Sequence, residues 1–198
     1  MKNSKNNTLF VSTLQNKLLP FIGILTIILF VIFRPDAIMI GIYFLVIISL
    51  LLAKRMRDIY YLCISSIIAL LWLLLTNNQY GYNQEFFSFF GLQSFPLFAW
   101  ALGLFASYKI AMHILGKRNK KNTLYFSFFI YWILLFMVET TAYHIFNIKN
   151  ISASQYLGLP ICNCIHAPHW MQLSYFLLGP IYYLIILRTN KKNSSPKK

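Results

Sequence analysis

The stretch TLYFSFFIYWILLFMVETTAYHIF, residues 123–146, decides the fold, because it is almost entirely apolar and long enough to cross a bilayer. A run of roughly 17–25 such residues is what a membrane-spanning helix requires. Its only carboxylate is Glu139, and an acidic side chain inside a span is costly unless it is paired, hydrated or used. This segment therefore predicts a membrane protein and also a candidate site.

Similar apolar runs follow one another along the rest of the chain. Together with residues 123–146 they make six predicted spans: 18–33, 37–53, 59–75, 96–115, 123–146 and 171–187. With 58% hydrophobic and only 11% charged residues, the composition is far from that of a soluble domain. We predict an all-α polytopic membrane protein, with a six-helix transmembrane bundle at 18–187, a cytoplasmic tail at 1–17 and a disordered basic tail at 188–198.

The net charge of +14 would suggest nucleic acid in a soluble protein, so the positions of the basic residues decide its meaning. All but three lie in the two tails or in the second and fourth connections between spans; the exceptions are Arg34, Lys109 and Lys149. The positive-inside rule then predicts that both termini are cytoplasmic. The expected partners of the charges are anionic membrane lipids, not nucleic acid. The abundance of Asn, Lys and Ile favours an AT-rich bacterial genome, hence a bacterial cytoplasmic membrane.

Glu139 is the first candidate site residue. At about 1.5 Å per residue it lies about 24 Å along a helix that starts near Thr123, in the outer third of a span of about 30 Å. Tyr143 follows one turn later on the same face, whereas His144 lies about 140° around the helix from Glu139. A general acid or base, a proton carrier or a ligand would use such groups, so the catalytic candidates are Glu139, Tyr143 and His144. The alternative is that Glu139 is a hydrogen-bonded strut between helices.

The last connection carries thiols and imidazoles, the ligands that zinc and copper(I) prefer. We take as metal candidates Cys162, Cys164, His166 and His169, with Zn or Cu as the candidate cofactor. The spacings C-x-C and H-x-x-H are shorter than those of common zinc sites, which argues against this interpretation. Two alternatives are a redox-active cysteine pair, whose direct bridge would close a small ring, and a rigid cap packed on the bundle.

The predicted span 96–115 carries small residues on one face at helical spacing, namely Ala99, Gly103 and Ala106. This pattern permits close helix packing, either within the chain or in a homo- or hetero-oligomer. Lys109, near the inner end of the same span, is expected to reach toward lipid phosphates.

Two further features concern local geometry. The aromatic segment 86–90 is expected to lie in the membrane interface or to extend the following helix. Pro180, directly after Gly179, is expected to disturb the last span, because proline lacks the N–H that a helix uses.

These patterns support function hypotheses rather than a named reaction. The leading one is a small membrane protein with an outward-facing polar site under the Cys/His-bearing loop, which acts on or binds a lipid or isoprenoid substrate. The alternatives are an interaction or assembly subunit without catalysis, and a membrane protein that binds or handles Zn or Cu. The patterns leave open whether the protein is an enzyme.

Overall fold

The computed structural model describes residues 34–116 and 120–193, which are mainly helical. The long helices are α2 Pro35–Leu52, α3 Met56–Thr76, α4 Ser94–Leu115, α5 Lys120–Thr140 and α6 His169–Asn193. The short elements are the 3-10 turns η1 Asn77–Gln79 and η3 Ile151–Ala153, the π-helical turn η2 Thr141–Ile145, and the strands β1 Ser88–Phe89 and β2 Leu92–Gln93.

Within the described residues, 5 helices are long and apolar enough to cross a membrane. They confirm the prediction of a helical, membrane-type chain and match the last five predicted spans. The first predicted span, 18–33, and the tail at 1–17 lie outside the described residues. The count of six helices and the cytoplasmic termini therefore stay predictions. α6 continues to Asn193, beyond the predicted end of its span at Leu187.

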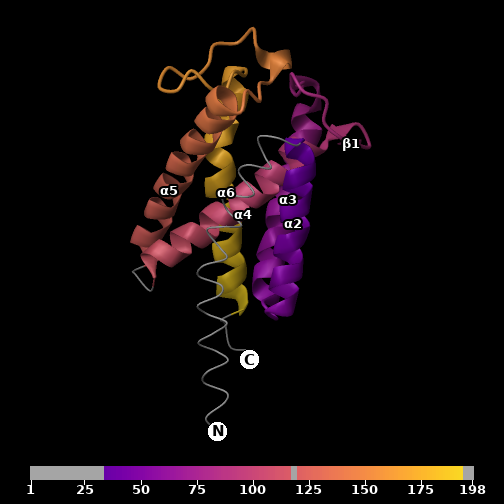
Figure 1. Ribbon diagram of the computed structural model, residues 1–198. Coiled ribbons are helices and arrows are strands. Elements are labelled where there is room, and N and C mark those ends of the chain that lie inside the picture. The colour runs from indigo at the N-terminus through magenta and orange to yellow at the C-terminus, as the bar shows by residue number, and fades with distance from the viewer. Residues whose placement is uncertain (1–33, 117–119, 194–198) are drawn as a thin grey trace.

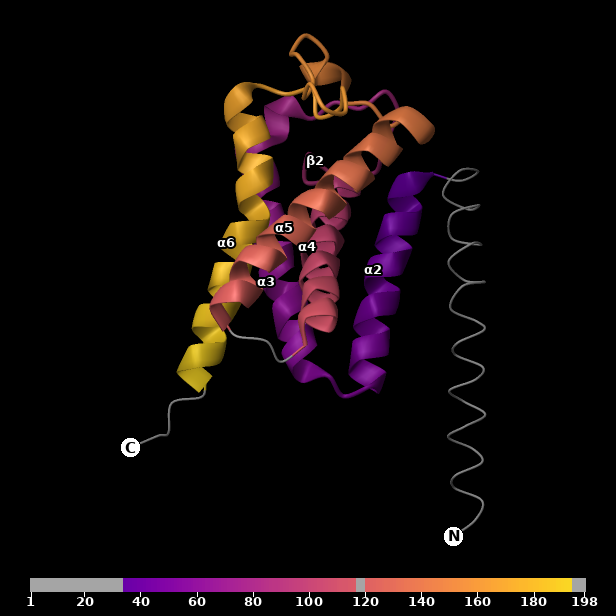
Figure 2. The same cartoon turned by 90° about the vertical axis from the view of Figure 1, so that its left-hand side faces the viewer.

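α4 is the central helix of the bundle. It packs against α3, α2 and α5, and Figures 1 and 2 show it crossing the middle of the molecule. The segment 146–168, which we call the cap, lies over the end of the bundle where α5 ends and α6 begins (Figure 1, orange). We call this end the cap end, and the opposite end, at residues 54–57, the basic end. A site under the cap is thus framed by α4, α5 and α6.

The aromatic segment 86–90 does not extend α4. It belongs to an antiparallel hairpin of β1 and β2, whose turn residues Phe90 and Gly91 have positive φ values of 52° and 78°. The backbone N–H of Phe87 donates a hydrogen bond to Oδ2 of the buried Asp36 at 2.7 Å. The hairpin is therefore tied to the start of α2, a contact across the chain that the local pattern of rings does not indicate.

Pro180 lies inside α6, and the neighbouring helix supplies hydrogen bonds at this point. Because proline has no N–H, the carbonyl of Phe176 loses its intrahelical donor. Trp132 Nε1 of α5 donates to that carbonyl oxygen at 3.0 Å. One residue earlier, the Tyr131 hydroxyl donates to the carbonyl oxygen of Tyr175 at 2.5 Å. These bonds fix α5 against α6 beside the cap end.

At the basic end, Asp58 is buried and paired. Its carboxylate accepts a hydrogen bond from Lys109 Nζ at 3.0 Å and forms an ion pair with Arg55. Lys109 was expected to reach lipid phosphates, but the structure turns it toward α3, where a carboxylate with 9% exposure needs a counter-charge. The pair joins α3 to the central helix.

Changing Asp58→Asn should lower the free energy of unfolding by about 1–3 kcal/mol, because Lys109 would lose its charged partner in a partly buried site. The measurement is denaturant unfolding of the purified protein in mixed micelles. In a double-mutant cycle, Asp58→Asn combined with Lys109→Met should cost less than the two single changes added together. If the losses in the free energy of unfolding add to within about 0.5 kcal/mol, the ion pair between Asp58 and Lys109 contributes nothing to stability.

Candidate functional site

A cavity of about 150 Å³ lies between α4, α5 and α6 under the cap. This is the size of an engineered protein cavity that holds a benzene-sized molecule. Its walls are mostly aromatic and aliphatic, and Glu139 is the only carboxylate among the lining residues. The structure therefore brings the predicted residues Glu139, Tyr143 and His166 to one space, although they come from α5, η2 and the cap.

Glu139 stands one residue before the end of α5, where the chain passes into the π-helical turn η2. Such turns inside or at the end of a helix occur frequently at functional sites. Within residues 34–116 and 120–193, the Glu139 carboxyl group makes no hydrogen bond or ion pair with another side chain or with the backbone. The hydrogen-bonded strut between helices is therefore not seen in the described part of the chain.

Two other polar residues that line the cavity, Asn150 and Ser107, have partners. The Asn150 amide accepts from Gly81 N at 3.0 Å and donates to the Gln79 carbonyl oxygen at 2.7 Å. The Ser107 hydroxyl donates to the carbonyl oxygen of Leu104 at 2.9 Å. Their side chains are engaged in holding the scaffold, whereas the carboxyl group of Glu139 is left to the cavity.

His166 forms part of the cavity wall from the cap side. Its ring stacks on Tyr143 with centroids 5.0 Å apart and planes at 20°. Its Nδ1 lies 2.9 Å from the Tyr156 carbonyl oxygen, and its Nε2 lies 3.3 Å from that of Asn163. A Cβ at Gly158 would come within 2.8 Å of His166 Nε2, so glycine is required for the imidazole to lie here. Because both ring nitrogens face carbonyl oxygens, neither is directed at a metal.

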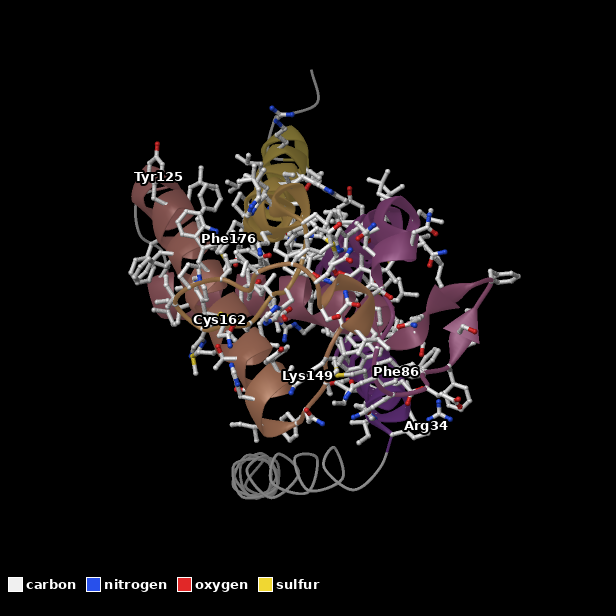
Figure 3. All side chains as sticks on the ribbon, turned by 90° about the horizontal axis from the view of Figure 1, so that it is seen from above. Arg34, Phe86, Tyr125, Lys149, Cys162 and Phe176 are labelled. Atoms are coloured by element: carbon white, nitrogen blue, oxygen red, sulfur yellow. A yellow bond between two sulfur atoms is a disulfide. The ribbon has the colours of Figure 1, made fainter. Side chains whose placement is uncertain are left out.

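His144 does not share the cavity. Its Nε2 is 2.8 Å from the carbonyl oxygen of Cys162, and its side chain is exposed. Figure 3 looks down on the bundle from the cap end and shows Cys162 over α5. Of the catalytic candidates, Glu139 and Tyr143 line the cavity, while His144 holds the cap to the end of α5.

The candidate metal ligands do not form a metal site in the described residues. Cys162 and Cys164 are joined by a disulfide, which removes the thiolates that a soft metal ion would bind. No group of three or more His, Cys, Asp or Glu side chains able to hold a metal ion occurs there. His169 begins α6 and is exposed. From the sequence, a direct bridge between these cysteines is not favoured because it closes a small ring. The structure nevertheless contains this bridge.

The disulfide belongs to a well-anchored cap. Leu159 donates its backbone N–H to the Cys164 carbonyl oxygen at 2.8 Å. From α6, the Gln172 amide donates to the carbonyl oxygens of Leu157 and Ile165, at 2.8 and 3.1 Å. These bonds agree with the interpretation of this connection as a rigid cap packed on the bundle.

A hydrogen-bonded group of rings, not predicted from the sequence, supports the wall opposite Glu139's helix. Trp72 Nε1 and Trp100 Nε1 donate to Tyr80 Oη at 3.0 and 3.2 Å, and Tyr80 Oη lies 2.8 Å from Tyr175 Oη. Burial raises the pKa of Tyr80 to about 12, so its hydroxyl stays protonated. Trp100 and Tyr175 line the cavity directly. Of these four residues, only Tyr175 has a signal in the sequence, because it shares one helical face of the last span with Gln172, Gly179 and Tyr182.

The cavity is open toward the outer surface of the bundle between α4 and α5. Gly103 of α4 and Val138 of α5 both line it, and both are exposed, Val138 with 63% of its surface. A Cβ added to Gly103 would meet no atom within 4 Å. Ala99 lines the cavity too, so two of the three small residues on α4 form its wall. Oligomerisation through this face stays a prediction.

Comparison of the chain with protein-family models, with curated proteins and with solved structures finds no match.

Proposed function

We propose that the cavity binds a lipid-soluble amphiphile, such as an isoprenoid or another lipid, whose small polar head lies at Glu139 and whose chain leaves between α4 and α5. The observation that carries the proposal is that the Glu139 carboxyl group has no partner among the described residues and lines an otherwise mostly apolar space. An acidic side chain costs about 2.5–3.5 kcal/mol at the centre of a span and less toward the interface, and a ligand bonded to Glu139 would offset this cost.

The size and opening of the cavity support an amphiphile with a chain rather than a compact polar solute. A volume of about 150 Å³ accommodates a head group and the first part of a chain. The remainder can pass the exposed Gly103 and Val138 into the hydrocarbon of the membrane. The apolar and aromatic walls suit such a chain, since ligand sites combine apolar surface with a few placed polar groups.

The sidedness of the proposed site follows from the charge pattern. The cap end lies opposite the connection that carries Lys54, Arg55 and Arg57, which the positive-inside rule assigns to the cytoplasm. The cavity would then draw its ligand from the outer leaflet. Glu139 and Tyr143 are also the groups that a reaction at this head would use, so binding is the first step to test.

Changing Glu139→Met keeps the length of the side chain and removes its polar end. We expect farnesol, an isoprenoid alcohol used as the probe, to bind about tenfold or more weakly, because its head loses the carboxyl group. The ligand-free variant should be more stable than the wild type by about 1–3 kcal/mol, because an unpaired acid has been removed from an apolar site. The measurements are native mass spectrometry with farnesol and thermal unfolding in nanodiscs.

The control is Glu85→Met, which makes the same change at an exposed position away from the cavity and should alter neither quantity. The two measurements together separate a ligand-binding acid from a structural one. A Glu139→Met variant that unfolds more easily and still binds farnesol as well as the wild type would contradict the proposal.

A further inference from the structure

The hydroxyl of Tyr80 accepts from two donors that cannot accept in return. The indole N–H groups of Trp72 and Trp100 point at the same Tyr80 oxygen, at 3.0 and 3.2 Å. An indole nitrogen is a donor only, and a phenol oxygen has two lone pairs. Both lone pairs of Tyr80 are therefore in use, and its own hydrogen remains for the third contact, to Tyr175 Oη at 2.8 Å.

This count fixes the direction of the bond between the two tyrosines. Tyr80 donates and Tyr175 accepts, so the hydrogen of Tyr175 cannot be directed at Tyr80. Within the described ranges, no other acceptor is bonded to the Tyr175 hydroxyl, and the side chain lines the cavity. A buried hydroxyl hydrogen without an acceptor is costly, so a ligand that accepts from it is favoured.

We infer that the head group recognised in this cavity is a hydroxyl, held between Tyr175 as hydrogen-bond donor and Glu139 as acceptor. The inference rests on the proposed function and names the chemical class of its ligand, an amphiphilic alcohol. A hydroxyl donates one hydrogen bond and accepts others, so it satisfies both groups at once. A carboxyl group can accept from it in either of its protonation states, through the carbonyl oxygen or through the carboxylate.

Other head groups satisfy only part of this arrangement. An alkylammonium ion has three donors and no acceptor, so it would leave the hydrogen of Tyr175 unmatched. An aldehyde or ketone accepts from Tyr175 but has no hydrogen to give to Glu139, and it pairs with this residue only when the carboxyl group is protonated and donates. In a buried site, leaving a hydrogen-bonding group unsatisfied costs more free energy than forming its hydrogen bond gains. The differences between these head groups therefore decide which ligand binds most tightly.

The test compares probes that share one chain and differ in the head: farnesol, farnesal and farnesylamine. Their affinities are measured for the wild type and for Tyr175→Phe in nanodiscs by native mass spectrometry. We expect the wild type to bind farnesol most tightly. Tyr175→Phe should weaken farnesol and farnesal by about 2- to 10-fold and leave farnesylamine unchanged.

The control variant is Tyr61→Phe, which removes a tyrosine hydroxyl that bonds Asn190 at 2.6 Å near the basic end. It matches the loss of one hydrogen bond without touching the cavity, so thermal unfolding of both variants separates a stability effect from a binding effect. If farnesylamine binds most tightly and Tyr175→Phe does not alter the farnesol affinity, the hydroxyl assignment is wrong while the cavity remains a binding site. If none of the probes binds the wild type, or if all of them bind Gly103→Leu as tightly as the wild type, the proposed function itself fails.

Discussion

Replacing Gly103 by leucine is expected to abolish detectable farnesol binding without lowering the stability of the protein. Gly103 lines the cavity where it opens between α4 and α5, and a Cβ there would meet no atom within 4 Å. The leucine side chain can therefore occupy the space that the proposal gives to the ligand. Glycine inside a helix is less favourable than alanine by about 0.8–1.0 kcal/mol, so the variant should unfold at the same temperature as the wild type or higher.

The chain offers a matched control for this change in Gly41. It lies in α2, is exposed, also has no atom within 4 Å of an added Cβ, and does not line the cavity. Gly41→Leu should leave farnesol affinity unchanged. Native mass spectrometry of both variants in nanodiscs measures binding, and thermal unfolding measures stability. Equal farnesol affinity in Gly103→Leu and Gly41→Leu would mean that the probe binds elsewhere.

Replacing Gly179 by alanine should have the opposite effect, a large loss of stability. A Cβ at this position would lie 2.4 Å from two ring atoms of Tyr131, far inside contact distance. The ring cannot easily give way, since Tyr131 is buried and its hydroxyl is bonded to the carbonyl oxygen of Tyr175. We expect a loss of about 3 kcal/mol in the free energy of unfolding, at the upper end for overpacked sites.

Denaturant unfolding in mixed micelles measures this loss, with Gly103→Ala as the comparison because it adds the same methyl group to a helix in open space. If the clash is the cause, Tyr131→Ala combined with Gly179→Ala should cost less than the sum of the two single changes. An unchanged unfolding midpoint for Gly179→Ala would show that α5 and α6 do not approach as closely as the structure has them.

The helices of the described region could be predicted from the sequence because a long apolar run has few alternatives in a membrane. Glu139 could be singled out for a related reason, since an acid in such a run requires an explanation. The contacts between distant segments could not be predicted from the sequence. Nothing near Lys109 indicates that its partner is Asp58, 51 residues earlier.

The residues that support the cavity wall could not be predicted from the sequence either. Tyr80 is one of two tyrosines in a polar connection, and its role arises only because α3, α4 and α6 bring Trp72, Trp100 and Tyr175 to its hydroxyl. The small residues Ala99 and Gly103 indicate that something can approach α4 closely, but not whether it is a helix or a ligand. In the structure this face borders a cavity.

The most direct test of a ligand site under the cap is photocrosslinking in native membranes with a diazirine derivative of farnesol, followed by peptide mapping. We expect the label to concentrate on the cavity-lining parts of α4 and α5, around Gly103 and Glu139, and to be lost in Gly103→Leu. Label spread evenly over the exposed apolar faces of α2 and α3, and unchanged in Gly103→Leu, would contradict it.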